Sequence, residues 1–167
     1  MANILALISS YVYQSKMCQI AHDVEKINDK IIYVSLNKTY KTLLAQFKQD
    51  QVFLDKFFFI DVITATVIEP KPDENCLFLQ SADDLNTLYA GIIKIVKEKG
   101  ADMMIFDSLS SLTTYKNLDE IMHFVTALLG SLSVFDCSAI FTCLQTDEDA
   151  PLIQHIKMKV DKSYELN

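Results

Sequence analysis

The fold of this chain is indicated first by Ser10-Tyr11-Val12-Tyr13-Gln14-Ser15-Lys16-Met17, which follows an apolar run at residues 4–8. These eight residues have the spacing of the phosphate-binding motif G-x-x-x-x-G-K-[ST], in which the last hydroxyl binds Mg²⁺. Both glycine positions hold serine, and Met17 stands where the hydroxyl is expected. Only Lys16 matches the motif. The segment therefore predicts the frame of a nucleotide-binding fold without most of the motif's chemistry.

Apolar runs alternate with segments of helical period along the rest of the chain. We expect strands at residues 4–9, 31–36, 57–62, 76–79, 103–106 and 138–144. Helices are expected at residues 15–27, 39–49 and 117–132, and between Asp83-Asp84 and Gly100. This alternation predicts an α/β fold, a mainly parallel sheet with helices on both faces, in a single domain over residues 1–167. The tail, residues 153–166, predicts one or two edge strands, for which antiparallel pairing stays open.

Polar residues follow several of the expected strands. Asp107 ends the run Met103-Met104-Ile105-Phe106, Asn37-Lys38 follows residues 31–36, and Gln145 follows residues 138–144. Ligands bind at the carboxyl ends of the strands in an open α/β sheet. We therefore expect these residues to gather with residues 10–17 along one edge of the sheet.

Three segments carry a resemblance to a known family. They are Ile31-Ile32-Tyr33-Val34-Ser35-Leu36, Phe58-Phe59-Ile60-Asp61 and Ile105-Phe106-Asp107-Ser108-Leu109-Ser110-Ser111-Leu112. With the order of elements, they resemble the RecA superfamily, and within it the KaiC-like, RadA-type archaeal ATPases and their degenerate relatives. The last segment is similar to the family's D-S-L-S-S-L run, and the resemblance covers nearly the whole chain. It implies a RecA-like P-loop NTPase fold with a degenerate Walker A motif, and vestigial nucleotide-binding positions at Ser10, Ser15, Lys16, Met17, Asp107 and Ser108.

Departures from the family pattern affect three parts of the hydrolysis machinery. Serine at the two glycine positions costs about 1–2 kcal/mol each where left-handed backbone is required. The thioether of Met17 is a poor ligand for Mg²⁺, which prefers oxygen. Active relatives carry acidic residues after the second strand, where this chain has Asn37-Lys38. We therefore predict that ATP hydrolysis is lost, with no catalytic residue, no metal site and no cofactor.

An alternative stays open for Lys16 and Asp107. Lys16 lies near the start of an expected helix, where it either holds an anion or is a solvated side chain on a surface turn. Asp107 orients Mg²⁺ in a working site, and otherwise accepts hydrogen bonds from neighbouring hydroxyls such as Ser108. The alternative function is an ATP or ADP sensor, or a weak ATPase, that binds ATP and Mg²⁺ through these two residues.

The serines after Asp107 and the acid at position 61 have simpler interpretations. Ser108, Ser110 and Ser111 have no histidine base near them in the sequence, and we expect them to cap a turn rather than to act as nucleophiles. Asp61 ends the third strand, like the phospho-acceptor of a receiver domain. That fold needs an acidic pair after the first strand, where this chain has Ser9-Ser10, so we discount it.

Two tyrosines lie where a phosphate loop is expected. Tyr11 and Tyr13 either fold over the carboxyl edge and fill the nucleotide pocket, or present an exposed surface to a partner. The simplest alternative is that both rings pack locally on the first helix. These tyrosines are the candidate interaction residues. The favoured function is a non-catalytic module that binds a protein partner or a second copy, as a regulatory partner of an active relative.

Composition bounds the partners and the compartment. The formal net charge of −7 disfavours nucleic acid and anionic membranes as partners, because both attract positive fields. The four cysteines form no C-x-x-C pair and the three histidines are scattered, so neither a zinc site nor a disulfide framework is indicated. No apolar stretch reaches the roughly 20 residues that span a bilayer, and the first residues lack the basic region of a signal peptide. We expect a reducing, cytoplasmic setting.

Overall fold

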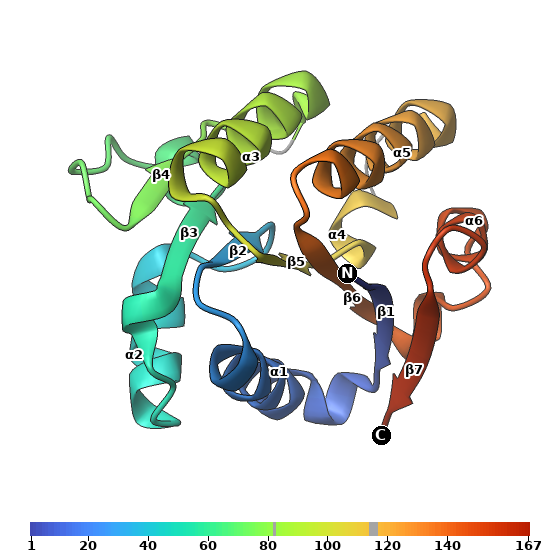
Figure 1. The fold of residues 1–167 in the computed structure, drawn as a ribbon, viewed down its shortest axis with the longest axis horizontal. Helices are drawn as coiled ribbons and strands as arrows, with labels where there is room; N and C mark the ends of the chain where they lie inside the picture. Colours follow the sequence, from blue (N-terminus) through green and yellow to red (C-terminus); the bar gives the residue numbers. More distant parts are fainter. Residues whose placement is uncertain (82, 114–116) are drawn as a thin grey trace.

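The computed structural model describes residues 1–81, 83–113 and 117–167 and contains a seven-stranded sheet (Figure 1). The strands lie in the order β4-β3-β2-β5-β6-β1-β7, and all neighbouring strands in this sheet are parallel. Their bounds are β1 (Asn3–Ile8), β2 (Ile31–Ser35), β3 (Phe57–Asp61), β4 (Cys76–Phe78), β5 (Met103–Asp107), β6 (Ser138–Leu144) and β7 (Lys162–Leu166). The predicted α/β fold with a mainly parallel sheet is confirmed.

Helices cover both faces of the sheet and divide the core in two. On one face lie α1 (Tyr13–Ile27) and α2 (Tyr40–Gln49), which bury residues such as Met17 and Phe47 against the strands. On the other face lie α3 (Leu85–Lys99), α5 (Leu118–Val134) and α6 (Pro151–Lys157), next to the short helix α4 (Ser110–Thr113). Short 3₁₀ turns lie at Ser10–Val12, Leu54–Lys56, Thr64–Thr66 and Gln145–Asp147. No helix in the described part of the chain is long and apolar enough to cross a lipid bilayer.

Polar caps fix the helix ends close to the predicted positions. The Thr39 side chain accepts from the Thr42 amide at the start of α2, and Asp84 accepts from the amides of Asn86 and Thr87 at the start of α3. Gly100, with φ of +61°, ends α3 in the left-handed conformation that glycine adopts without strain. These caps satisfy amide groups that have no partner within the helix.

The prediction of edge strands at residues 153–166 is wrong for the first half of the segment and correct for the second half, where β7 is an edge strand. The first half forms α6, which begins at Pro151 and buries Leu152, Ile153 and Ile156. Proline suits the first helical turn, where its missing amide donor costs nothing, and this start signal outweighs the short alternating pattern. The strand that follows, β7, pairs with β1 in parallel and not antiparallel register. The helix carries the chain back across the sheet, so β7 starts at the same end as β1.

The topology brings four strand ends together. β5 lies between β2 and β6, and β6 lies between β5 and β1. The chain leaves β1 for a helix on one face of the sheet and leaves β5 for a helix on the other face. The register places Ser35 beside Asp107, and the Leu36 amide donates to the Asp107 carbonyl over 2.7 Å. The residues that follow β1, β2, β5 and β6 therefore lie along the same edge of the sheet.

Candidate functional site

A buried carboxylate, Asp107, lies at the centre of the carboxyl edge. Its side chain is 1% exposed and accepts hydrogen bonds at both oxygens. The Tyr13 hydroxyl donates to Oδ1 over 2.7 Å, and the Tyr33 hydroxyl donates to Oδ2 over 2.5 Å. Tyr13 opens α1, and Tyr33 lies in the middle of β2. The carboxylate therefore joins three elements that are far apart in the sequence.

A third hydroxyl extends this cluster into β6. The Tyr13 hydroxyl lies 2.9 Å from Thr142 Oγ1, and Thr142 Oγ1 lies 3.1 Å from the carbonyl oxygen of Phe106. Tyr13 and Thr142 therefore link the Asp107 side chain to the backbone at the end of β5.

Burial shifts the pKa values of the groups in this cluster. Burial raises the pKa of Asp107 above its ordinary value, while the hydrogen bonds from Tyr33 and Tyr13 and the charge of Lys38 partly oppose the rise. Burial, followed by the neighbouring Asp107 charge, also raises the pKa of Tyr13 and of Tyr33. The pKa values of all three groups are thus shifted upward, chiefly by burial.

The segment expected to form a phosphate loop is a turn followed directly by a helix. Residues Ser10–Val12 form a 3₁₀ turn, and α1 starts at Tyr13, before the two motif positions Ser15 and Lys16. Among the described non-glycine residues, only Gln51 and Asp136 have positive φ. The expected strain of serines in left-handed backbone is therefore wrong. The backbone has no left-handed residue in this segment because α1 begins at Tyr13, before the second glycine position of the motif.

The motif residues point in different directions. Ser10 is exposed, and Ser15 Oγ donates to the Val12 carbonyl over 2.9 Å, as helix-start serines do. Lys16 is partly exposed, with Nζ 3.4 Å from Gln19 Oε1 on the same helix. Met17 is 3% exposed and packs in the core beneath α1. The side chain at the motif's metal position is thus part of the hydrophobic core.

The two candidate tyrosines have different surroundings. Tyr13 covers Asp107, as described above. Tyr11 is 97% exposed, so the expectation that both rings fold over the edge is wrong for Tyr11. Tyr11 instead borders a hollow of about 740 Å³ between α1 and the end of α2. The residues lining this hollow are Ser10, Tyr11, Gln14, Ser15, Cys18, Gln19, His22 and Asp50.

The serines after β5 form hydrogen bonds with one another and with the backbone. Ser108 is 3% exposed, its Oγ lies 3.5 Å from Ser111 Oγ, and a cis peptide bond joins it to Asp107. The Ser110 hydroxyl accepts from the Leu144 amide over 2.8 Å, which ties α4 to the end of β6. The hydroxyls that donate to Asp107 belong to tyrosines, so the expectation that Ser108 is its partner is wrong.

The residues after β2 also contribute to the edge. Ser35 Oγ donates to the Lys38 carbonyl over 2.7 Å and accepts from its amide over 3.1 Å, which closes a tight turn. Lys38 Nζ donates to Gln46 Oε1 over 3.1 Å. Asn37 and Lys38 both lower the pKa of Asp107, so the turn lies close enough to act on that carboxylate. Gln145 starts the 3₁₀ turn after β6.

A second buried acid, Asp61, lies at the end of β3 and organises backbone. It is 1% exposed. One oxygen accepts from the amides of Ile63 and Thr64 over 2.7 and 2.9 Å, and the other accepts from the Tyr40 amide over 2.7 Å and from the Thr64 hydroxyl over 2.5 Å. These bonds fix the turn after β3 and the start of α2.

Metal and thiol chemistry have little support at this edge. Across residues 1–81, 83–113 and 117–167, no three His, Cys, Asp or Glu side chains lie together as metal ligands. The four cysteines (Cys18, Cys76, Cys137 and Cys143) are buried and unpaired. Burial raises the pKa of the Cys137 and Cys143 thiols to about 12, so both stay protonated at neutral pH.

Sequence reasoning did not single out Tyr33 and Thr142, which complete the cluster. Each lies inside an apolar, buried strand and is a residue type that strands favour, so each resembles ordinary core. The usable signal is the polar atom itself, because a hydroxyl in a fully buried strand needs a hydrogen-bond partner.

Comparisons with known proteins agree with this architecture. A family model described as the KaiC ATPase matches residues 18–160. The match begins directly after the Ser10–Met17 segment. The structure is similar to the crystal structure of a KaiC-like protein from the hyperthermophilic archaeon Pyrococcus horikoshii OT3, with a TM-score of 0.66 and 13% sequence identity. That similarity covers 99% of this chain and 73% of the other, and it shows the fold alone. No curated protein sequence matches the chain significantly.

Proposed function

The chain belongs to the KaiC ATPase family, and we propose that it is a non-catalytic member that acts through contacts with protein partners. The observation that carries the proposal is that Asp107 is buried and covered by two tyrosine side chains. Tyr13 and Tyr33 donate to both carboxylate oxygens, and the side chain is 1% exposed. Mg²⁺ needs oxygen ligands in near-octahedral geometry and keeps several waters. Burial and the two tyrosine hydrogen bonds therefore disfavour the approach of a metal ion or its water to Asp107.

The phosphate side of the site supports the same conclusion. A phosphate loop works because successive backbone amides point at the anion. Here a 3₁₀ turn and then a helix occupy the segment, while Met17 is buried in the core. The family match starts at Cys18, which leaves this segment outside it. Phosphoryl transfer depends on positioning and metal, so the helical form of this segment and the burial of Met17 support a non-catalytic role.

A contact role is supported by what the segment exposes. Tyr11 is 97% exposed beside a hollow of about 740 Å³. An aromatic ring in water is a frequent anchor of protein interfaces, because it gains a large buried area on binding. In our proposal Tyr11 contacts a protein partner or a second copy of the chain, while Tyr13 covers Asp107 and bonds to it.

The experiment that tests the proposal measures ATP turnover by the purified protein with Mg²⁺ and with Mn²⁺. We expect no turnover above the buffer background. Lys16→Ala is the informative variant, and Lys41→Ala, an exposed lysine on α2, is its matched control. Turnover that disappears in Lys16→Ala and persists in Lys41→Ala would contradict the proposal.

A nucleotide sensor is the second candidate, and one observation favours it. The hollow beside α1 is lined by Ser10 and Ser15, two of the motif positions, and it is open to solvent. A thermal-shift titration with ATP or ADP separates the candidates. A ligand at 100 times its Kd adds about 2.7 kcal/mol of stability. A shift that Lys16→Ala abolishes supports the sensor, and an unchanged melting temperature supports the contact module.

A further inference from the structure

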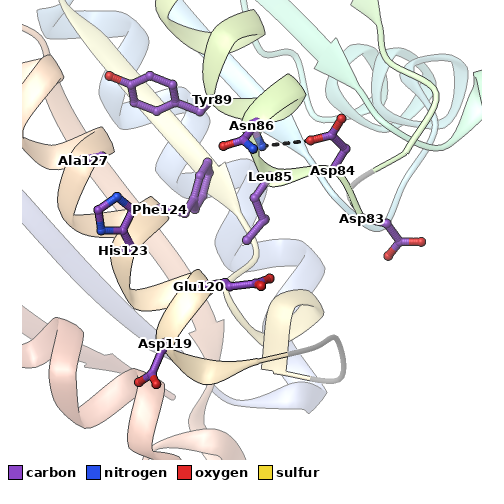
Figure 2. Close-up of a pocket in the computed structure, with 10 residues that line it drawn as sticks. All are labelled: Asp83, Asp84, Leu85, Asn86, Tyr89, Asp119, Glu120, His123, Phe124 and Ala127. Atoms are coloured by element: carbon purple, nitrogen blue, oxygen red, sulfur yellow. Dashed lines mark hydrogen bonds between the residues drawn. The ribbon is translucent and has the colours of Figure 1, made fainter.

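A groove separate from the Asp107 site lies between the first turns of α3 and α5 (Figure 2). It is a hollow of about 660 Å³ on the sheet face opposite α1 and α2. Figure 2 shows side chains from the two helices facing each other across it.

The floor of the groove is apolar and firmly packed. Leu85 from α3 and Phe124 from α5 point into it, with Ala127 one turn further along α5. The Phe124 ring is 5% exposed and belongs to the core beneath. Tyr89 is held by a 2.6 Å hydrogen bond between its hydroxyl and Ser131 Oγ. The floor is therefore a preformed surface of the kind that receives an apolar side chain.

The rim of the groove is acidic. Asp83 and Asp84 lie at the α3 end, and Asp119 and Glu120 lie at the α5 end. Among the described residues that line the hollow none is a lysine or an arginine, and His123 is the one histidine. Asp84 also caps α3. Asp119 and Glu120 are exposed, and neither forms an ion pair with a residue in the described part of the chain. Four acids around an apolar floor create a negative field at the mouth of the groove.

We propose that this groove binds a segment of a partner protein in which an apolar side chain is flanked by lysine or arginine. The apolar side chain covers Leu85 and Phe124, and the basic groups face the acidic rim. This charge complementarity selects the partner and its orientation, while the apolar floor supplies the buried area. The inference rests on the proposed contact function, since it names the chemistry of the partner.

The test uses three fluorescein-labelled peptides and the full chain. One peptide combines lysine and leucine at helical spacing, the second replaces every lysine by glutamate, and the third replaces every leucine by serine. Binding is measured by fluorescence anisotropy at low and at physiological salt. We expect the lysine–leucine peptide to bind, with affinity falling as salt rises. We expect the glutamate peptide not to bind and the serine peptide to bind at least about tenfold more weakly.

Variants then locate the binding surface. Asp119→Asn with Glu120→Gln should weaken the lysine–leucine peptide about tenfold, since two charge pairs are lost. The control, Glu69→Gln with Glu74→Gln, removes two exposed acids elsewhere and should change the Kd by less than about twofold. Ala127→Arg places a bulky cation in the groove and should abolish binding. Circular dichroism checks that each variant is folded, and Ala127→Arg keeps the proposal testable if the first pair destabilises α5.

Three outcomes overturn the inference: no binding of the lysine–leucine peptide, equal binding of the serine peptide, or equal losses in the rim and control variants. The proposed function fails by a different measurement. ATP turnover in the same preparation would refute the non-catalytic role and leave the peptide result standing. Failure of the peptide to bind, without turnover, would refute the groove alone.

Discussion

Asp61 and Asp107 occupy equivalent places at the ends of β3 and β5, yet their surroundings differ. Each is 1% exposed and accepts hydrogen bonds at both oxygens. Three of the four donors to Asp61 are backbone amides, two of them within three residues of it. Both donors to Asp107 are tyrosine hydroxyls, 94 and 74 residues away in sequence. Asp61 therefore builds local backbone, whereas Asp107 fastens distant elements to one another.

The largest expected effect comes from removing the first of these acids. Asp61→Ala leaves three amides without an acceptor, the buried amide of Tyr40 and the partly buried amides of Ile63 and Thr64. An unsatisfied buried donor costs about 1–3 kcal/mol, so we expect a loss of about 3–5 kcal/mol, measured by urea unfolding. Asp61→Asn keeps one acceptor and should lose less. Equal stability of Asp61→Ala and the wild type would show that Asp61 does not stabilise the backbone around it.

A smaller loss is expected when the tyrosine donors to Asp107 are removed. Tyr13→Phe and Tyr33→Phe should each cost about 1–3 kcal/mol, because each deletes a hydrogen bond to a buried charged group. The double variant should lose less than the sum. Removing one donor raises the pKa of Asp107 further, and a neutral carboxyl accepts weaker bonds. A double-mutant cycle in urea measures this coupling, and strict additivity would show that the two tyrosines act independently.

The stability contributed by Asp107 should depend on pH. Burial raises the pKa of folded Asp107 above its ordinary value of 3.8, so over that interval the folded state binds more protons than the unfolded state. The stability contributed by Asp107 therefore falls as the pH rises from about 4, by at most about 1.4 kcal/mol per pH unit. Asp107→Asn does not titrate.

The measurement is the difference in unfolding free energy between the wild type and Asp107→Asn at several pH values. That difference should shift in favour of the variant as the pH increases. A shift in the opposite direction would mean that the tyrosine hydrogen bonds outweigh burial and hold Asp107 ionised.

The smallest effect on stability is expected from a substitution of Tyr11, two residues before Tyr13. Tyr11→Ser removes a ring that is 97% exposed, so the unfolding free energy should change by less than about 0.5 kcal/mol. Sedimentation analysis should show weaker self-association or partner binding in the same variant, with Tyr164→Ser as the control for loss of another exposed ring. Unchanged association would leave Tyr13 as the only tyrosine of this segment with an assigned role.

Most of the helices and strands could be predicted from the sequence, whereas the contacts of the site could not. Strand ends at Asp61 and Asp107, and caps at Thr39 and Asp84, follow from local composition, because each depends on residues within three positions. The donors to Asp107 depend on how β2, β5 and α1 meet in space, and local pattern carries no information on that. The helix α6 was missed because seven residues show too few turns for a clear period.

The tyrosine cluster also makes the protein's response to alkali directly visible. The chain has seven tyrosines and no tryptophan, so its absorbance near the tyrosinate band is free of indole. Burial and the neighbouring carboxylate raise the pKa of Tyr13 and Tyr33 above the ordinary value of 10.0, which the unfolded chain retains. Above that pH the unfolded state holds fewer protons, so stability falls with rising pH. Ionisation of the phenols with a raised pKa, which include Tyr40 as well as Tyr13 and Tyr33, therefore accompanies the opening of the structure and is measured without an attached dye.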